Sequence, residues 1–256
     1  MSRYKHILWY VPLVIILSCI LYLCSSMVFI TADYQQVVPE YEPPLQKSSG
    51  FLAQAVVSLN MEAAENPVLY QQELANWRIV NEDVQGIINI EDFDIHYPVL
   101  YSGDNKTYLR HDIEHNYDVA GCIFIDANYG NIYSPMKLIH GHNMSNGTMF
   151  GKLPSLLQEE SLDDAPIVEY YDDLGLKQFK VIAIFSVNSE EESVIIGEYS
   201  TINDLLDLKQ GYLDRSWVPV SEVPDSVEML MLNTCWYGKT GHEHYLHCII
   251  VTCRVK

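Results

Sequence analysis

An apolar run near the C-terminal end leads into a cysteine: Leu230-Met231-Leu232-Asn233-Thr234-Cys235-Trp236-Tyr237. The run from Val227 to Leu232 is typical of a buried strand. It stops at two small polar residues, so Cys235 is predicted at the mouth of a sheet, where a thiol can face solvent and substrate. A cysteine inside an apolar run is more often unreactive. Whether Cys235 is a nucleophile therefore depends on a partner elsewhere in the chain.

The bulk composition indicates one acidic domain with a sizeable core. The chain has 256 residues, is 48% hydrophobic and carries a formal net charge of −19. This length allows one large core rather than two. An acidic chain repels phosphate backbones, so the charge argues against nucleic-acid binding.

The N-terminal residues predict a membrane anchor. The stretch 7–30 is apolar and uncharged over 24 residues. As a helix it would span roughly 36 Å, which is enough to cross a bilayer core. Arg3 and Lys5 precede it, so residues 1–6 are expected in the cytoplasm and the C-terminal bulk outside. A cleaved signal peptide is the alternative, although its apolar core would be shorter and would end in a small-x-small site.

The rest of the chain is predicted to be a stalk, a helical segment and a strand-rich domain. Residues 31–50 contain three prolines and suit an extended stalk. Residues 51–79 are helix-compatible, and residues 80–256 form the domain. About eight short strands with few helices predict a mainly β fold, a closed or nearly closed barrel with peripheral helices. The expected strands cover 84–90, 93–100, 119–125, 136–139, 167–171, 178–187, 227–234 and 245–255, and the expected helices 105–110, 147–158 and 200–214.

Four cysteines lie beyond the apolar N-terminal stretch, namely Cys122, Cys235, Cys248 and Cys253. An exported domain permits disulfides. Cys248 and Cys253, however, point to opposite faces of one predicted strand and cannot pair with each other. We expect mostly free thiols, with a disulfide of Cys122 left open.

A histidine follows the fourth predicted strand much as the cysteine follows the seventh. The imidazole of His142 could take the thiol proton of Cys235, or stabilise the thiolate, and later protonate a leaving amine. Acyl transfer also needs a donor for the oxyanion, often an arginine or backbone amides. A Cys-His pair by itself is a weak signal, because many exported proteins contain both residues.

Several motifs resemble those of the class B sortases. The segment Leu138-Ile139-His140-Gly141-His142-Asn143-Met144 is similar to their "YGHNM" segment, and Met231-Leu232-Asn233-Thr234-Cys235 is similar to their "TLxTC" signature. Residues 119–126 resemble their "AGSIFLD" strand, and residues 81–87 and 95–99 resemble the strands that open their barrel. The resemblance covers roughly residues 74–255, with the motifs in the family's order.

The resemblance implies a membrane-anchored cysteine transpeptidase of a Gram-positive bacterium. Sortases cut a sorting motif near the C-terminus of a surface protein or pilin. A thioester acyl-enzyme forms, and its acyl group passes to an amine of a cell-wall precursor or to a pilin lysine. By this resemblance Cys235 is the nucleophile and His142 the general acid/base, with no cofactor. The protein would cross the cytoplasmic membrane once, with its catalytic domain extracellular.

The chain departs from the family pattern at an arginine and, less centrally, at Met231 and His140, where the family motifs have threonine and tyrosine. Sortases carry an arginine near the start of the last strand, where this chain has Tyr245. Alignment of the strand ends places His247 at that position instead. Both side chains can donate a hydrogen bond, and His247 is the better candidate for the oxyanion donor. Further possible cleft-lining residues are His140, Asn143, Thr234, Trp236 and Tyr237.

Two rival functions and a metal site are also considered. Without the arginine, the domain could be a degenerate sortase that binds a sorting motif or a partner protein without turnover. An unrelated exported cysteine peptidase fits less well, because papain-like enzymes place the cysteine before the histidine and caspase-like ones need a different cysteine context. A zinc site is not predicted, because Leu246 stands where an HExxH pattern starting at His242 would need histidine.

Overall fold

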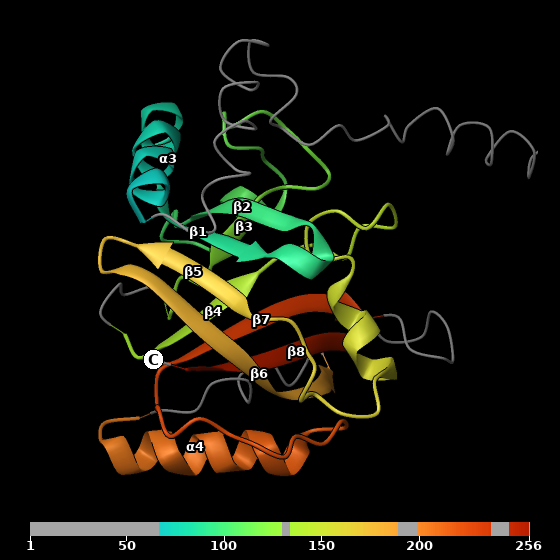
Figure 1. Cartoon of the computed structure of the whole chain (residues 1–256). Coiled ribbons are helices and arrows are strands. Elements are labelled where there is room, and N and C mark those ends of the chain that lie inside the picture. The colour runs from blue at the N-terminus through green and yellow to red at the C-terminus, as the bar shows by residue number, and fades with distance from the viewer. Residues whose placement is uncertain (1–66, 130–133, 189–198, 237–245, 256) are drawn as a thin grey trace, which may run out of the picture. The chain divides into compact units, whose positions relative to one another are not determined.

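The computed structural model describes residues 67–129, 134–188, 199–236 and 246–255 (Figure 1). The predicted anchor, the stalk and the first part of the predicted helical segment lie outside these residues. So do Tyr237 and Tyr245. Within the described ranges, no helix has both the length and the apolar character needed to cross a membrane.

Eight strands close into a barrel, as the sequence predicts. Their barrel order is β1-β2-β3-β4-β7-β8-β6-β5 (Figure 1). Two neighbouring pairs, β2–β3 and β4–β7, are parallel, and the other neighbours are antiparallel. The strands are β1 (Val84–Ile90), β2 (Ile95–Leu100), β3 (Ile123–Ile125), β4 (Met136–His140), β5 (Val168–Asp172), β6 (Gly175–Asn188), β7 (Met229–Trp236) and β8 (Leu246–Arg254).

Helix α4 (Ile202–Arg215) explains why β7 is a continuous apolar run. Leu205 and Tyr212 of α4 pack in one cluster with Met229 and Met231 of β7. The intervening residues of β7 point to the opposite face and are also buried, so both faces of the strand are covered. A capping box at Thr201, with Asp204, begins the helix.

Helix α3 (Pro67–Val80) lies beside β1 and covers a second apolar cluster (Figure 1). Its Tyr70 and Leu74 are buried together with Ile87 of β1 and Tyr108. These contacts pack α3 against the barrel.

Two segments predicted to be helical form 3-10 helices rather than α-helices. The structure has three-residue 3-10 turns at η2 (Glu91–Phe93) and η3 (Thr107–Leu109) and a six-residue one at η4 (Leu153–Gln158). Within the range 147–158, Gly147 and Met149 take left-handed backbone angles, which interrupt an α-helix. Strand β2 starts later than predicted because Asp94 is also left-handed, with φ of 53°.

Strand β3 is shorter than predicted because a turn precedes it. Gly121 has φ of +55°, and its N–H donates to Asp118 O at 3.2 Å. A Cβ at this position would lie 2.3 Å from the backbone oxygen of Tyr108. Only glycine fits where β3 enters the sheet.

Replacement of this glycine should destabilise the fold. Gly121→Ala is expected to lower the free energy of unfolding by about 3 kcal/mol, because left-handed strain adds to a backbone overlap. Gly103→Ala is the matched control, since Gly103 also has positive φ but nothing lies within 4 Å of its added Cβ. Urea unfolding of both variants checks this, and equal losses would contradict it.

Candidate active site

Parallel pairing of β4 and β7 brings Cys235 and His142 to one cleft. The register pairs His140 of β4 with Asn233 of β7, and each functional residue lies two positions further along its own chain. Gly141 N–H extends the ladder by donating to Asn233 O at 3.0 Å. The cleft has a volume of about 70 Å³. Its lining consists of Leu109, Phe124, His140, Gly141, His142, Asn233, Thr234, Cys235 and His247.

The loop after β4 is fixed from both sides. A Cβ on Gly141 would lie 2.6 Å from the ring of Phe150, whose N–H donates to His142 O at 3.0 Å. Asn143 Nδ2 donates to Cys235 O at 2.7 Å, which joins the histidine loop directly to the cysteine. Asn143 also forms a bridge with Met149. The backbone of the two reactive residues is therefore positioned as one unit.

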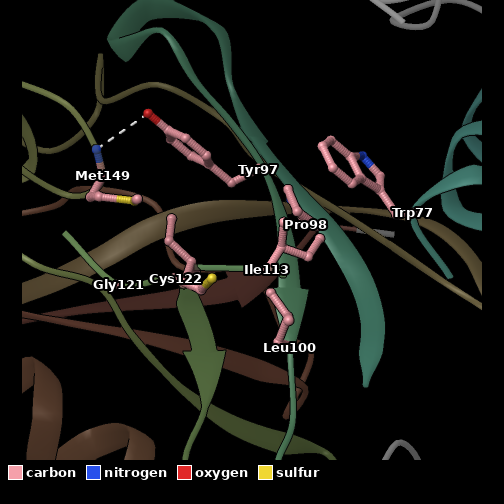
Figure 2. Close-up of a pocket in the computed structure, with 9 residues that line it drawn as sticks. Trp77, Tyr97, Pro98, Leu100, Ile113, Gly121, Cys122 and Met149 are labelled. Atoms are coloured by element: carbon pink, nitrogen blue, oxygen red, sulfur yellow. Dashed lines mark hydrogen bonds between the residues drawn. The ribbon is translucent and has the colours of Figure 1, made fainter. Parts of the chain in front are cut away.

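A small apolar pocket supports this loop from behind. Figure 2 shows Tyr97 pointing toward Met149, whose N–H donates to the Tyr97 hydroxyl at 3.3 Å. The cavity is about 20 Å³ and is lined mostly by apolar side chains from α3, β2 and the segment before β3. A space of this size and polarity suits at most a single water. The side chains around this cavity therefore support the loop, and the cavity itself is too small for a substrate.

The other described cysteines are unsuited to nucleophilic chemistry. Cys122 is a free thiol and makes no disulfide. Burial raises the pKa of Cys122 and Cys253, and raises the pKa of Cys248 to about 12. Of the four described cysteines, Cys235 alone is only partly buried. The accessible thiol is the one at the cleft.

His142 is held in its neutral form. Burial lowers its pKa, and the positive charge of Arg110 lowers it further, against a hydrogen bond to Leu109 that raises it. His142 Nε2 donates to Leu109 O at 2.9 Å, so the lone pair of the neutral ring is on Nδ1. At neutral pH the ring is therefore ready to accept a proton at Nδ1.

The remaining predicted residues and the last arginine of the chain lie in three places. His140, Thr234 and His247 line the cleft. Trp236 packs edge to face against Trp217, with ring centroids 5.4 Å apart. Arg254, the last arginine of the chain, binds Glu228 at 2.7 Å and lies at the end of β8 that is far from Cys235. It cannot serve at the cleft.

Sequence reasoning gave no role to four residues that the structure places around the cleft. Asp126 accepts a hydrogen bond from His140, and Asn233 joins His140 to His247. Leu109 accepts a hydrogen bond from His142, and the charge of Arg110 adds to the burial that lowers the pKa of His142. Asp126 and Asn233 lie inside the motifs that suggested the family, but nothing in the sequence marks the segment around Leu109 as close to His142.

Comparison with known proteins agrees with this geometry. No family model matches the chain. Sortase B of Listeria monocytogenes is 29% identical over 167 residues, which are 64% of this chain and 68% of that protein. Sortase B of Staphylococcus aureus is 26% identical over 116 residues, which are 45% of this chain but 48% of that protein, so this match spans about half of its length.

Solved structures share the fold. The crystal structure of the Listeria sortase B has a TM-score of 0.57 at 28% identity, covering 70% of this chain and 99% of that one. The curated relatives and the solved structures together support a class B sortase. A structure of the Staphylococcus aureus sortase B with substrate has a TM-score of 0.65 at 21% identity, covering 80% and 94%. A structure of a sortase B complexed with triglycine has a TM-score of 0.64 at 20% identity, and the match covers 79% of this chain and 95% of that one.

Class B sortases are cysteine transpeptidases, and this sortase has the thiol and the imidazole that such chemistry needs. Cys235 and His142 come from neighbouring parallel strand ends, in an open cleft. Within the described residues no group of three or more His, Cys, Asp and Glu side chains is arranged to hold a metal ion. The loop that contains His242 and His244 lies outside these residues.

Removal of the charge on Arg110 should raise the pKa of His142. The cation disfavours the protonated imidazole, so Arg110→Gln makes protonation easier and moves the acidic limb of kcat/KM to higher pH. NMR titration of the His142 ring measures the same change without substrate. Lys106→Gln removes an exposed charge nearby and serves as the control. A His142 titration equal in both variants would contradict the assignment.

Proposed function

We infer that this sortase cleaves a sorting motif near the C-terminus of a surface protein or pilin and transfers the acyl group to an amine. The observation that carries this inference is the paired exit of His142 and Cys235 from parallel strands β4 and β7. A partly buried thiol and a neutral imidazole that line the same cleft are the two groups that covalent acyl transfer requires.

The reaction proceeds in two halves. Nδ1 of His142 takes the thiol proton, and the thiolate of Cys235 attacks the scissile carbonyl. Collapse of the tetrahedral intermediate breaks the C–N bond, and His142 returns the proton to the leaving amine, which leaves a thioester on Cys235. An acceptor amine then attacks the thioester, loses a proton to His142 and releases the thiol.

The acceptor and the membrane location are parts of the same proposal. The relatives solved with substrate and with triglycine support a peptide substrate and a small amine acceptor. The amine belongs to a cell-wall precursor or to a pilin lysine, and parallel assays with a glycine peptide and a lysine peptide distinguish these acceptors. Anchoring by residues 7–30 rests on their apolar sequence alone.

A second candidate function is supported by the missing arginine. Tyr245 stands where sortases have this residue, so the domain could bind a sorting motif without turnover. Accumulation of a thioester by the wild-type protein distinguishes the enzyme from the binding module.

Loss of the thiol at the cleft should abolish the chemistry. Cys235→Ala is expected to give neither peptide cleavage nor a thioester adduct, read by intact-protein mass with a panel of sorting-motif peptides. Cys122→Ala is the matched control, because that thiol is buried in the apolar pocket, and it should keep activity (Figure 2). Retained turnover in Cys235→Ala would refute the assignment.

A further inference from the structure

A row of polar side chains crosses four neighbouring strands beside Cys235. Asp126 directly follows β3, His140 ends β4, Asn233 lies in β7 and His247 lies in β8. These strands are adjacent in the barrel. The register pairs His140 with Asn233, and it pairs Cys235 with His247. We call these four residues the polar row.

Consecutive hydrogen bonds join the polar row. His140 Nε2 lies 2.9 Å from Asp126 Oδ2, Asn233 Nδ2 lies 3.0 Å from His140 Nδ1, and His247 Nδ1 lies 3.0 Å from Asn233 Oδ1. Asp126 is 6% exposed and Asn233 is 2% exposed. The bonds are therefore shielded from bulk water, where hydrogen bonds polarise one another most strongly.

The carboxylate at one end fixes the proton positions along the row. Asp126 can only accept, so His140 carries hydrogen on Nε2. The amide nitrogen of Asn233 can only donate, so Nδ1 of His140 accepts this hydrogen bond. The other end of that amide is its carbonyl oxygen, which accepts from Nδ1 of His247. Nε2 of His247 can then donate a hydrogen bond only when the ring is cationic.

We propose that His247, as an imidazolium, donates the hydrogen bond to the oxyanion that an arginine donates in other sortases, and that Asp126, His140 and Asn233 are positioning residues that stabilise this cation. The inference rests on the proposed function. Directly paired residues on antiparallel strands share one face with Cβ atoms about 5 Å apart, which places His247 beside the nucleophile. His247 keeps both of its ring hydrogens, while His142 carries the transferred proton.

The charge of the polar row favours the cation. The carboxylate of Asp126 polarises His140 and then the Asn233 amide, so the carbonyl oxygen that faces His247 becomes a stronger acceptor. A stronger acceptor at Nδ1 favours the charged ring. Burial raises the pKa of Asp126, but the hydrogen bonds from His140 and from the backbone of Asn128 outweigh this and lower it, so Asp126 is ionised at neutral pH.

Titratable and charged groups surround His247 from several elements. Cys235 faces it from β7, and its thiolate favours the cation. His140 and His142 line the same cleft, and the positive charge of a protonated His142 would disfavour the charged form of His247. Strand β6 pairs Val187 with His247 and brings no ionisable group at that position. Beyond the polar row, Arg110 acts on His142, and Asn105 Nδ2 donates to Asp126 Oδ2 at 2.8 Å.

Two single substitutions test the donor and the row. His247→Ala is expected to lower kcat by roughly a hundredfold or more with a smaller change in KM, which is the usual cost of a lost oxyanion donor. In the wild type, kcat/KM should fall at alkaline pH as His247 loses its proton. Asp126→Asn removes an interaction with the charged form, so the proton is lost more easily and this alkaline limb moves to lower pH.

A permanent cation separates a positioning role from a purely structural one. His247→Arg should keep kcat/KM high beyond the wild-type alkaline limb, because guanidinium stays charged. On this background Asp126→Asn should no longer shift the limb, whereas a general structural defect would act on both backgrounds. His96→Gln is the matched control, because it removes another histidine–carboxylate pair, 2.8 Å from Glu73, away from the cleft. Its pH profile should equal that of the wild type.

The outcomes are distinct. Wild-type kcat and pH profile in His247→Ala would overturn the donor, and an equal shift by Asp126→Asn on both backgrounds would overturn the positioning role. If the wild type and His247→Arg both form no thioester with any peptide, the proposed function itself fails. That result differs from an active enzyme that does not depend on His247.

Discussion

The parallel pairing of β4 with β7 is the constraint on which the site depends. Parallel neighbours point the same way, so both strands end at one edge of the barrel. His142 and Cys235 lie equally far beyond one register pair, and the Asn143 amide ties the histidine loop to the carbonyl of the cysteine. A shift of this register by one residue would turn Cys235 to the other face and separate the pair.

The same register creates the polar row. Polar side chains that are largely buried among apolar strands are costly unless each finds a partner. Here His140, Asn233 and His247 satisfy one another across three strands, and Asp126 ends the row at β3. The residues that depart from the family pattern, His140 and His247, are therefore parts of one network. A loss of the arginine and a gain of this network fit together physically.

Much of the fold was predictable, because periodicity and turn residues mark each strand. The apolar run of β7 and the hairpin of β5 and β6 carry strong local signals. The 3-10 turns were not predictable in type, since left-handed Met149 and Asp94 have no glycine to mark them. Cys235 and His142 came from motifs. Arg110 and Leu109 could not be found, because their effect on His142 arises only where distant segments meet. Tyr245 and Tyr237 lie outside the described residues and remain predictions.

Alkylation of the native full-length protein tests, without a known substrate, whether His142 activates Cys235. Iodoacetamide labelling followed by peptide mapping gives the rate at each cysteine over a range of pH. We expect Cys235 to react much faster than Cys122, Cys248 and Cys253, and His142→Ala to slow its reaction on the order of tenfold at neutral pH. A Cys235 that reacts at the same rate with and without His142 would contradict this expectation.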